Sequence, residues 1–85
     1  MAQTTNQGEM FYRMKYLGGD TPAHRISGDR VRCLIEDEAY EVYLRRTIEN
    51  DFPPYWMLTI HLPGESDVIM YYWHIEDFVE EWEDL

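Results

Sequence analysis

The segment that most restricts the fold of this chain is a hairpin in its C-terminal half. Apolar residues recur at every second position of residues 56–62, which is the period of a strand with one buried face. Pro63 and Gly64 follow and suit the centre of a type II turn, where proline sets the first φ and glycine accepts a positive second φ. Residues 68–73 return and are apolar on both faces. We therefore expect a β-hairpin with a second layer against it, either the terminal helix or a partner.

The first part of the chain carries shorter patterns. Residues 10–17 alternate in polarity with Arg13 and Lys15 on one face, which predicts a strand with its other face buried. Residues 21–29 contain proline, glycine and several polar side chains. They are expected to form a loop with one apolar anchor, Ile26.

Residues 30–46 fit two patterns. Their apolar residues match helical spacing, which leaves a helix over about 37–46 open. Two strands joined by a turn at residues 36–38 are favoured, because valine, isoleucine and tyrosine suit a pleated surface better than a helix. That turn contains neither glycine nor asparagine. Further on, Pro53 and Pro54 predict a break between strands, since proline cannot donate a ladder hydrogen bond.

Residues 74–85 predict an amphipathic helix. Apolar residues recur there at the i, i+3, i+4, i+7 spacing of a buried stripe, at Ile75, Phe78, Val79 and Trp82. Acidic residues cover the rest of the cylinder. A helix of this length is marginal alone, so we expect Phe78 and Trp82 to dock it on the sheet.

The length of 85 residues predicts one small domain over residues 10–85, preceded by a disordered polar tail at residues 1–9. Aromatic residues make up 15% of the chain, and their large buried areas offset a small core volume. The lone Cys33 cannot form an intrachain disulfide and is expected to be a small core residue. The sequence has no signal-peptide pattern and no run of 18 apolar residues. We therefore expect a cytoplasmic location and no membrane partner.

The order of these elements resembles that of small SH3-like barrel proteins of bacteria and their phages. The resemblance rests on Lys-Tyr-Leu-Gly at residues 15–18, a turn at Gly28 and Phe78 near the end, and it covers about residues 15–79. It implies a mainly β fold, bordering on α+β: a small antiparallel SH3-like barrel of about five strands with a C-terminal amphipathic acidic helix. The chain departs from the pattern by an insertion at residues 47–54 and a longer acidic helix. Such barrels are binding modules, so the resemblance implies an architecture and no catalytic residues.

The net charge of −10 is one-sided. Residues 1–46 carry seven Lys and Arg against seven Asp and Glu, whereas residues 47–85 carry ten Asp and Glu and no Lys or Arg. Charge asymmetry of this kind concerns partners rather than fold. It predicts a basic protein surface as the partner, such as that of a nucleic-acid-handling protein, and argues against direct binding of nucleic acid.

Six carboxylates of the terminal segment are candidate partner-binding residues: Glu76, Asp77, Glu80, Glu81, Glu83 and Asp84. On a helix, carboxylates four positions apart lie about 5–6 Å from each other, and two such rows approximate the phosphates of a nucleic-acid strand pair. An ordinary solvated helix face is the alternative. Like-charge pairs and carboxylates at a helix C-terminus both cost stability, which favours a functional reason for keeping them.

Three aromatic residues are further candidates: Tyr43, Tyr71 and Trp73. We expect them on outward faces beside acidic positions, because aromatic anchors in a charged surround are typical of interface hot spots. Packing beneath the helix is the alternative. Aromatics with carboxylates also build cages for methylated lysine and other quaternary cations, which is a third interpretation.

No pattern predicts catalysis, a metal site or a cofactor. The three histidines are dispersed, at His24, His61 and His74, and none has a second ligand at metal-binding spacing. We therefore expect a non-enzymatic acidic binding protein, an inhibitor that occupies the basic nucleic-acid-binding cleft of a target. By analogy, its setting would be that of a phage anti-defence protein such as an anti-CRISPR, or of a nuclease immunity protein. The alternative is an SH3-like adaptor that binds a basic or proline-rich peptide through surface aromatics.

Overall fold

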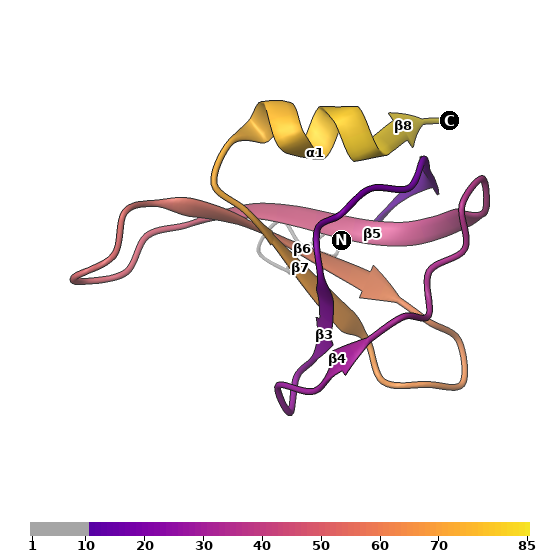
Figure 1. The fold of residues 1–85 in the computed structure, drawn as a ribbon, viewed down its shortest axis with the longest axis horizontal. Coiled ribbons are helices and arrows are strands. Elements are labelled where there is room, and N and C mark those ends of the chain that lie inside the picture. Colours follow the sequence, from indigo (N-terminus) through magenta and orange to yellow (C-terminus); the bar gives the residue numbers. More distant parts are fainter. Residues whose placement is uncertain (1–10) are drawn as a thin grey trace, which may run out of the picture.

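The computed structural model describes residues 11–85, which form one antiparallel sheet with a short helix packed on it (Figure 1). The predicted tail, residues 1–9, lies outside the described residues. Within residues 11–85, seven strands are hydrogen-bonded in the order β4-β3-β7-β6-β5-β2-β8. The elements are β2 Tyr12–Tyr16, β3 Ala23–Arg25, β4 Arg30–Val31, β5 Ala39–Thr47, β6 Tyr55–His61, β7 Val68–Tyr72, α1 Ile75–Glu81 and β8 Trp82–Asp84. The fold is therefore mainly β, as the sequence predicted.

The predicted hairpin is confirmed as β6 and β7. Trp56 lies opposite Tyr72 and Ile60 opposite Val68, so the apolar residues of both strands share one face. At the turn, Gly64 has a φ of 79°, and the Glu65 N–H donates to the Leu62 carbonyl over 3.0 Å. This is the geometry that a Pro-Gly type II turn supplies.

The core lies on one face of the sheet, which we call the inner face. The register aligns Val42 of β5, Ile60 of β6 and Val68 of β7 in one row, and all three are buried. A second row continues with Leu58 and Met70, which are inaccessible to solvent. Residues at the alternate positions point to the opposite, outer face.

Residues 37–46 do not form the alternative helix, because residues 39–47 are strand β5. The turn before β5 succeeds without glycine since Asp37 adopts a φ of 72°, a left-handed conformation that aspartate tolerates better than most residues. Backbone hydrogen bonds hold the turn against β2: the Asp37 N–H donates to the Tyr16 carbonyl over 2.7 Å, and the Tyr16 N–H donates to the Glu38 carbonyl over 2.9 Å. The strand predicted before the turn is short, only Arg30–Val31.

Residues 21–29 are not only a loop. Ala23–Arg25 pair with β7 as strand β3, and Ala23 is the buried residue of this segment. Ile26, the expected anchor, is 75% exposed. Ala23 replaces it because pairing with β7 sets Ala23 opposite the buried Met70.

The sheet is open, and the predicted five-stranded closed barrel is not what forms. Its edges are β4 and β8, which do not pair with each other. The sheet nevertheless curls over its inner face, because Trp82 of edge strand β8 donates from Nε1 to the hydroxyl of Tyr72 in β7 over 3.1 Å. These strands are four places apart in the sheet order. A side-chain contact, not a backbone ladder, therefore brings the distant strands together.

The predicted helix at residues 74–85 is wrong in its C-terminal part. The helix ends at Glu81, and Trp82 is extended, with φ −136° and ψ 140°. Residues Trp82–Asp84 instead pair with β2 as β8, where Trp82 packs on Tyr16 with ring centroids 5.0 Å apart. Val79 was expected in the buried stripe but is 61% exposed. Strand pairing and burial of the indole outweigh continuation of a helix whose last turn has no basic residue.

No helix within residues 11–85 is long and apolar enough to cross a membrane.

Candidate functional site

An aromatic cleft lies between the β5–β6 loop and the end of β7. It has a volume of about 320 Å³. We call it the aromatic cleft; its walls are Phe52, Tyr55, Tyr71 and Trp73, with Glu49 at the rim and the buried Tyr72 behind. The β5–β6 loop and the β7–α1 connection reach the same side of the molecule (Figure 1).

The sheet register assembles this cleft. Trp56 pairs with Tyr72, so Tyr55 lies next to Trp73 at the end of the hairpin, and Tyr71 lies opposite Met57 on the outer face. Tyr55 is 5.6 Å from Tyr71 and 6.1 Å from Trp73 between ring centroids, at interplanar angles of 66° and 73°. Two rings that meet edge to face leave one face of a ring free, whereas stacked rings cover each other's faces. Tyr71 is 49% and Trp73 58% exposed, so the prediction that these two aromatics face outward is confirmed.

A carboxylate is fixed at the rim of the cleft. The Tyr55 hydroxyl donates to Glu49 Oε2 over 2.7 Å. This hydrogen bond to the neutral phenol is the main reason that the pKa of Tyr55 is raised. Within residues 11–85, no hydrogen bond to Glu49 Oε1 is present, since the bond from Tyr55 reaches only Oε2. Glu49 therefore offers an ordered anionic acceptor beside four aromatic rings.

A second hollow, of about 380 Å³, connects the aromatic residues to the acidic helix. Tyr71 and Trp73 line it together with Asp77 and Glu80 of α1. Thr21 and Pro22, which precede β3, form its other wall. Glu81 lines the hollow as well, so the structure brings two of the three predicted aromatics and three of the six predicted carboxylates to one surface.

Within the described part of the chain, the exposed carboxylates of α1 have no cationic partner. Among residues 11–85, salt bridges join Lys15 to Glu83 over 3.9 Å and His61 to Asp67 over 3.0 Å. Glu76, Asp77 and Glu80 are all exposed, and none takes part in either pair. We call these three residues the acidic helix face.

Glu81 is turned into the fold. Its Oε1 accepts from the Tyr72 hydroxyl over 2.9 Å, and its Oε2 accepts from the Thr21 hydroxyl over 3.0 Å. Gly19 passes so close that a side chain there would overlap the Glu81 carboxylate. Glu81 is half-buried as a result. It therefore holds α1 to the β2–β3 loop and presents little of itself to a partner.

Three other predicted residues lie elsewhere. Glu83 and Asp84 are exposed on β8, and Glu83 faces Lys15 across the β2–β8 ladder. Tyr43 is half-buried on the outer face of β5, where its ring packs 6.0 Å from Phe11. None of the three lines the aromatic cleft or the hollow beside α1. The continuous helical rows of carboxylates are consequently shorter than predicted, since Asp84 is not helical.

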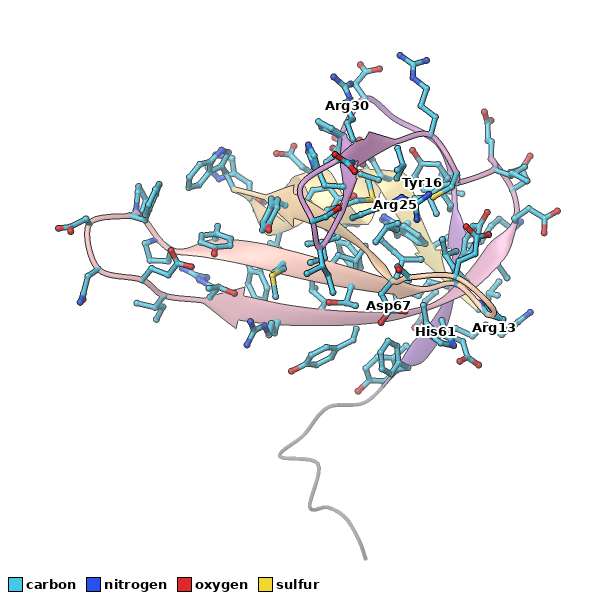
Figure 2. The ribbon with its side chains drawn as sticks, turned by 90° about the horizontal axis from the view of Figure 1, so that it is seen from below. Arg13, Tyr16, Arg25, Arg30, His61 and Asp67 are labelled. Carbon is cyan, nitrogen blue, oxygen red and sulfur yellow. The ribbon has the colours of Figure 1, made fainter. Side chains whose placement is uncertain are left out.

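Two basic residues lie far from α1. The β3–β4 hairpin lies on the opposite side of the molecule from the helix (Figure 1), and Figure 2 shows Arg25 and Arg30 on this hairpin. His61 and Asp67 face each other where β6 and β7 are joined (Figure 2). Arg46 lies over the Trp56 ring at 5.1 Å. The basic β3–β4 hairpin and the acidic helix therefore lie on opposite sides of the molecule.

A third hollow, of about 310 Å³, contains Cys33. Burial raises the pKa of the Cys33 thiol, which disfavours the reactive thiolate. Cys33 packs against the core as a half-buried apolar residue.

Within the described part of the chain, no three His, Cys, Asp or Glu side chains gather as a metal ion would require.

Sequence reasoning missed Glu49, Phe52 and Tyr55. Phe52 and Glu49 belonged to the predicted break before the hairpin, where no periodicity assigns a face. Tyr55 could have been found, because extending the predicted hairpin register by one residue places it beside Trp73. The loop itself bends at Asp51, which has a φ of 70°. That conformation brings the loop aromatic within reach of the sheet, and local patterns do not encode it.

Comparison with protein-family models, with curated proteins and with solved structures gave no match for this chain.

Proposed function

We propose that this chain is a non-enzymatic acidic binding protein that inhibits a nucleic-acid-handling protein by occupying its basic cleft. The observation that carries the proposal is the acidic helix face, Glu76, Asp77 and Glu80, which has no salt bridge within the described residues. A partner with lysine and arginine side chains would supply the missing cations.

The arrangement of the carboxylates supports this choice of partner. Glu76 and Glu80 are four positions apart on α1, which separates them by about 5–6 Å, and Asp77 lies beside them. Clefts that bind nucleic acid hold arginine and lysine side chains at positions set by the phosphates. Neighbouring carboxylates on one helix can meet several such cations at once.

The cost of this surface is a further argument. Like charges four residues apart destabilise a helix by about 0.2–0.5 kcal/mol. The last turn of α1 has no basic residue to interact with the negative end of the helix dipole. A helix of seven residues has little intrinsic stability with which to offset these terms. Binding of a cationic partner would relieve both.

A second candidate function is an adaptor that binds a basic or proline-rich peptide. The observation that favours it is the aromatic cleft, because grooves with exposed aromatic walls are used to recognise such peptides. The SH3-like resemblance of residues 15–79 agrees with an adaptor, although the sheet has seven strands and is open. The two candidates differ in the source of affinity, which is charge for the first and ring contact for the second.

The test compares capture of host proteins by the wild type and by two triple variants. In the first variant, Glu76→Gln, Asp77→Asn and Glu80→Gln neutralise the acidic helix face. In the control variant, Glu38→Gln, Glu41→Gln and Glu65→Gln remove the same charge from exposed positions elsewhere. We expect one or more host proteins to bind the wild type and the control but not the first variant.

Displacement then identifies the surface that the target uses. A short DNA duplex should release the captured target, because phosphates and carboxylates would compete for one cationic cleft. Retention of the target by the first variant, or failure of excess duplex to displace it, would contradict the inhibitor proposal. Loss of capture after substitution in the aromatic cleft alone would favour the adaptor.

A further inference from the structure

We propose that the aromatic cleft binds the guanidinium group of an arginine side chain from the partner protein. This inference deepens the proposed function and rests on it only for the source of the arginine. The cleft is a separate feature from the acidic helix face, and its affinity for a guanidinium can be measured without the target.

The ring arrangement favours a planar cation. Tyr55 meets Tyr71 and Trp73 nearly at right angles, so the three rings form a corner and do not stack on one another. About half of Tyr71 and more than half of Trp73 remain exposed, so ring surface is available to a ligand. A guanidinium can lie flat on one ring face while its edge meets the neighbouring ring.

Glu49 supplies the hydrogen-bond acceptor that an arginine needs. Its Oε2 is fixed by the Tyr55 hydroxyl at 2.7 Å, which orients the carboxylate at the rim. Within residues 11–85 Glu49 makes no salt bridge, although Arg45 lies on β5, which ends two residues before Glu49. A guanidinium donates from several N–H groups in a fixed plane, so ring contact and a charge-assisted hydrogen bond can form together.

The same observations disfavour a quaternary ammonium. A trimethylated lysine has no N–H to donate and gains most from rings that enclose it on several sides. Tyr71 and Trp73 are about half exposed, so the rings do not enclose a ligand on every side, and the Glu49 carboxylate can accept hydrogen bonds. Contact between a guanidinium and an aromatic ring already occurs within this chain, since Arg46 lies over the Trp56 ring at 5.1 Å.

Two carboxylates of α1 act in the same direction, opposed by the positive charge of Arg45, which also acts on Tyr55. Asp77 and Glu80 line the hollow that shares Tyr71 and Trp73 with the cleft. Their field would concentrate cations at the cleft and repel anionic side chains. Basic clefts that bind nucleic acid are rich in arginine, so the proposed target would present the required group.

The test uses four small probes and the full chain. N-acetyl-arginine methylamide, its neutral isostere N-acetyl-citrulline methylamide, and the corresponding lysine and trimethyl-lysine compounds are titrated while the indole N–H resonances are followed by NMR. We expect the arginine probe to shift the Trp73 signal and to bind about tenfold more tightly than the citrulline probe. The Trp82 signal should move little, because that N–H is buried and bonded to Tyr72.

Matched variants assign the binding to the cleft. Because Trp73→Leu lacks the reporting indole, affinities of the variants are measured by isothermal titration calorimetry. Trp73→Leu should weaken the arginine probe about tenfold, whereas Phe11→Leu, which removes another exposed aromatic outside the cleft, should not. Glu49→Gln keeps an acceptor for Tyr55 and should reduce affinity several-fold. Its control, Glu65→Gln, removes a charge from the β6–β7 turn and should leave affinity unchanged.

Three results would overturn the inference. They are equal binding of the arginine and citrulline probes, tighter binding of the trimethyl-lysine probe, and unchanged arginine binding in both Trp73→Leu and Glu49→Gln. Each would leave the proposed function standing if the acidic helix face is still required for capture of the target. Conversely, arginine binding in the cleft with no role for the acidic helix face would reject the inhibitor proposal and keep the cleft.

Discussion

At the scale of single residues, one polar network explains how the end of the chain is fixed. Trp82 donates to the Tyr72 hydroxyl, Tyr72 donates to Glu81, and Thr21 donates to the other Glu81 oxygen. Each donor has an acceptor, so partial burial of the carboxylate leaves no unpaired group in this network. Four residues from the β2–β3 loop, β7, α1 and β8 are therefore held together without a cation.

Gly19 is expected to be the most sensitive glycine. It has a φ of 149°, and a Cβ there would overlap the Glu81 carboxylate. Gly19→Ala should lower the free energy of unfolding by about 3 kcal/mol, because backbone strain and displacement of Glu81 add. Gly28→Ala is the control, since Gly28 has a φ of 103° with nothing near its Cβ position and should cost about 1 kcal/mol. Urea unfolding measures both, and equal losses would show that Glu81 moves aside freely.

Tyr72 is expected to make the fold sensitive to alkali. Burial, followed by the hydrogen bond to Glu81, strongly raises the pKa of Tyr72 in the folded chain. In the unfolded chain this phenol ionises near pH 10, so above about pH 10 the unfolded state is favoured by up to about 1.4 kcal/mol per pH unit. Below that pH both states keep the proton and the contribution is constant. Burial raises the pKa of Tyr16 too, which acts in the same direction.

Unfolding by urea between about pH 8 and pH 11.5 tests this expectation. Tyr72→Phe should be less stable than the wild type at pH 8, because it loses the bonds to Glu81 and Trp82. Its stability should also fall less steeply above pH 10. Identical slopes for the two proteins would show that Tyr72 does not govern the alkaline transition.

At the scale of elements, local signals predicted some segments and misled at others. The β6–β7 hairpin was predictable because its turn chemistry and alternation lie within one short stretch. β3 and β8 were not, because they are short and exist through pairing with β7 and β2, which are distant in sequence. The apolar spacing of residues 75–82 suits a helix up to Trp82, but the helix ends at Glu81 because Trp82 pairs with β2 as part of β8.

Substitutions at Trp82 and Val79 distinguish the predicted continuous helix from the observed helix followed by β8. Trp82 is 2% exposed and packs on Tyr16 and Tyr40, so Trp82→Ala should cost about 3–5 kcal/mol. Val79 is 61% exposed, so Val79→Ala should change stability by no more than about 0.5 kcal/mol. Thermal and urea unfolding compare the two. A large loss at Val79 would restore the continuous stripe and argue against β8.

At the scale of the whole molecule, the sequence predicted the charge of the surface but not the shape of the cleft. The one-sided charge was readable from the sequence, and so was the outward orientation of Tyr71 and Trp73. The aromatic cleft was not, because it needs the bend at Asp51 and the side-by-side placement of β5, β6 and β7. The inward turn of Glu81 was equally hidden, since its partners are Thr21 and Tyr72.

Binding kinetics should separate the two surfaces once a target is captured. The acidic helix face acts at a distance, so neutralising Glu76, Asp77 and Glu80 should slow association with the target and leave dissociation closer to the wild-type rate. Trp73 acts only on contact, so Trp73→Leu should speed dissociation and leave association nearly unchanged. Both variants replace exposed groups and should fold as the wild type does.

Salt provides the control for this assignment. The Debye length falls from about 10 Å at 0.1 M salt to about 3 Å at 1 M, so the association rate of the wild type should drop steeply across that range. The rate for the neutralised variant should drop much less, because part of its steering charge is gone. Surface plasmon resonance at several salt concentrations measures both rates. If association of the wild type is insensitive to salt while Trp73→Leu still speeds dissociation, ring contact rather than charge drives recognition, and the adaptor function takes the place of the inhibitor.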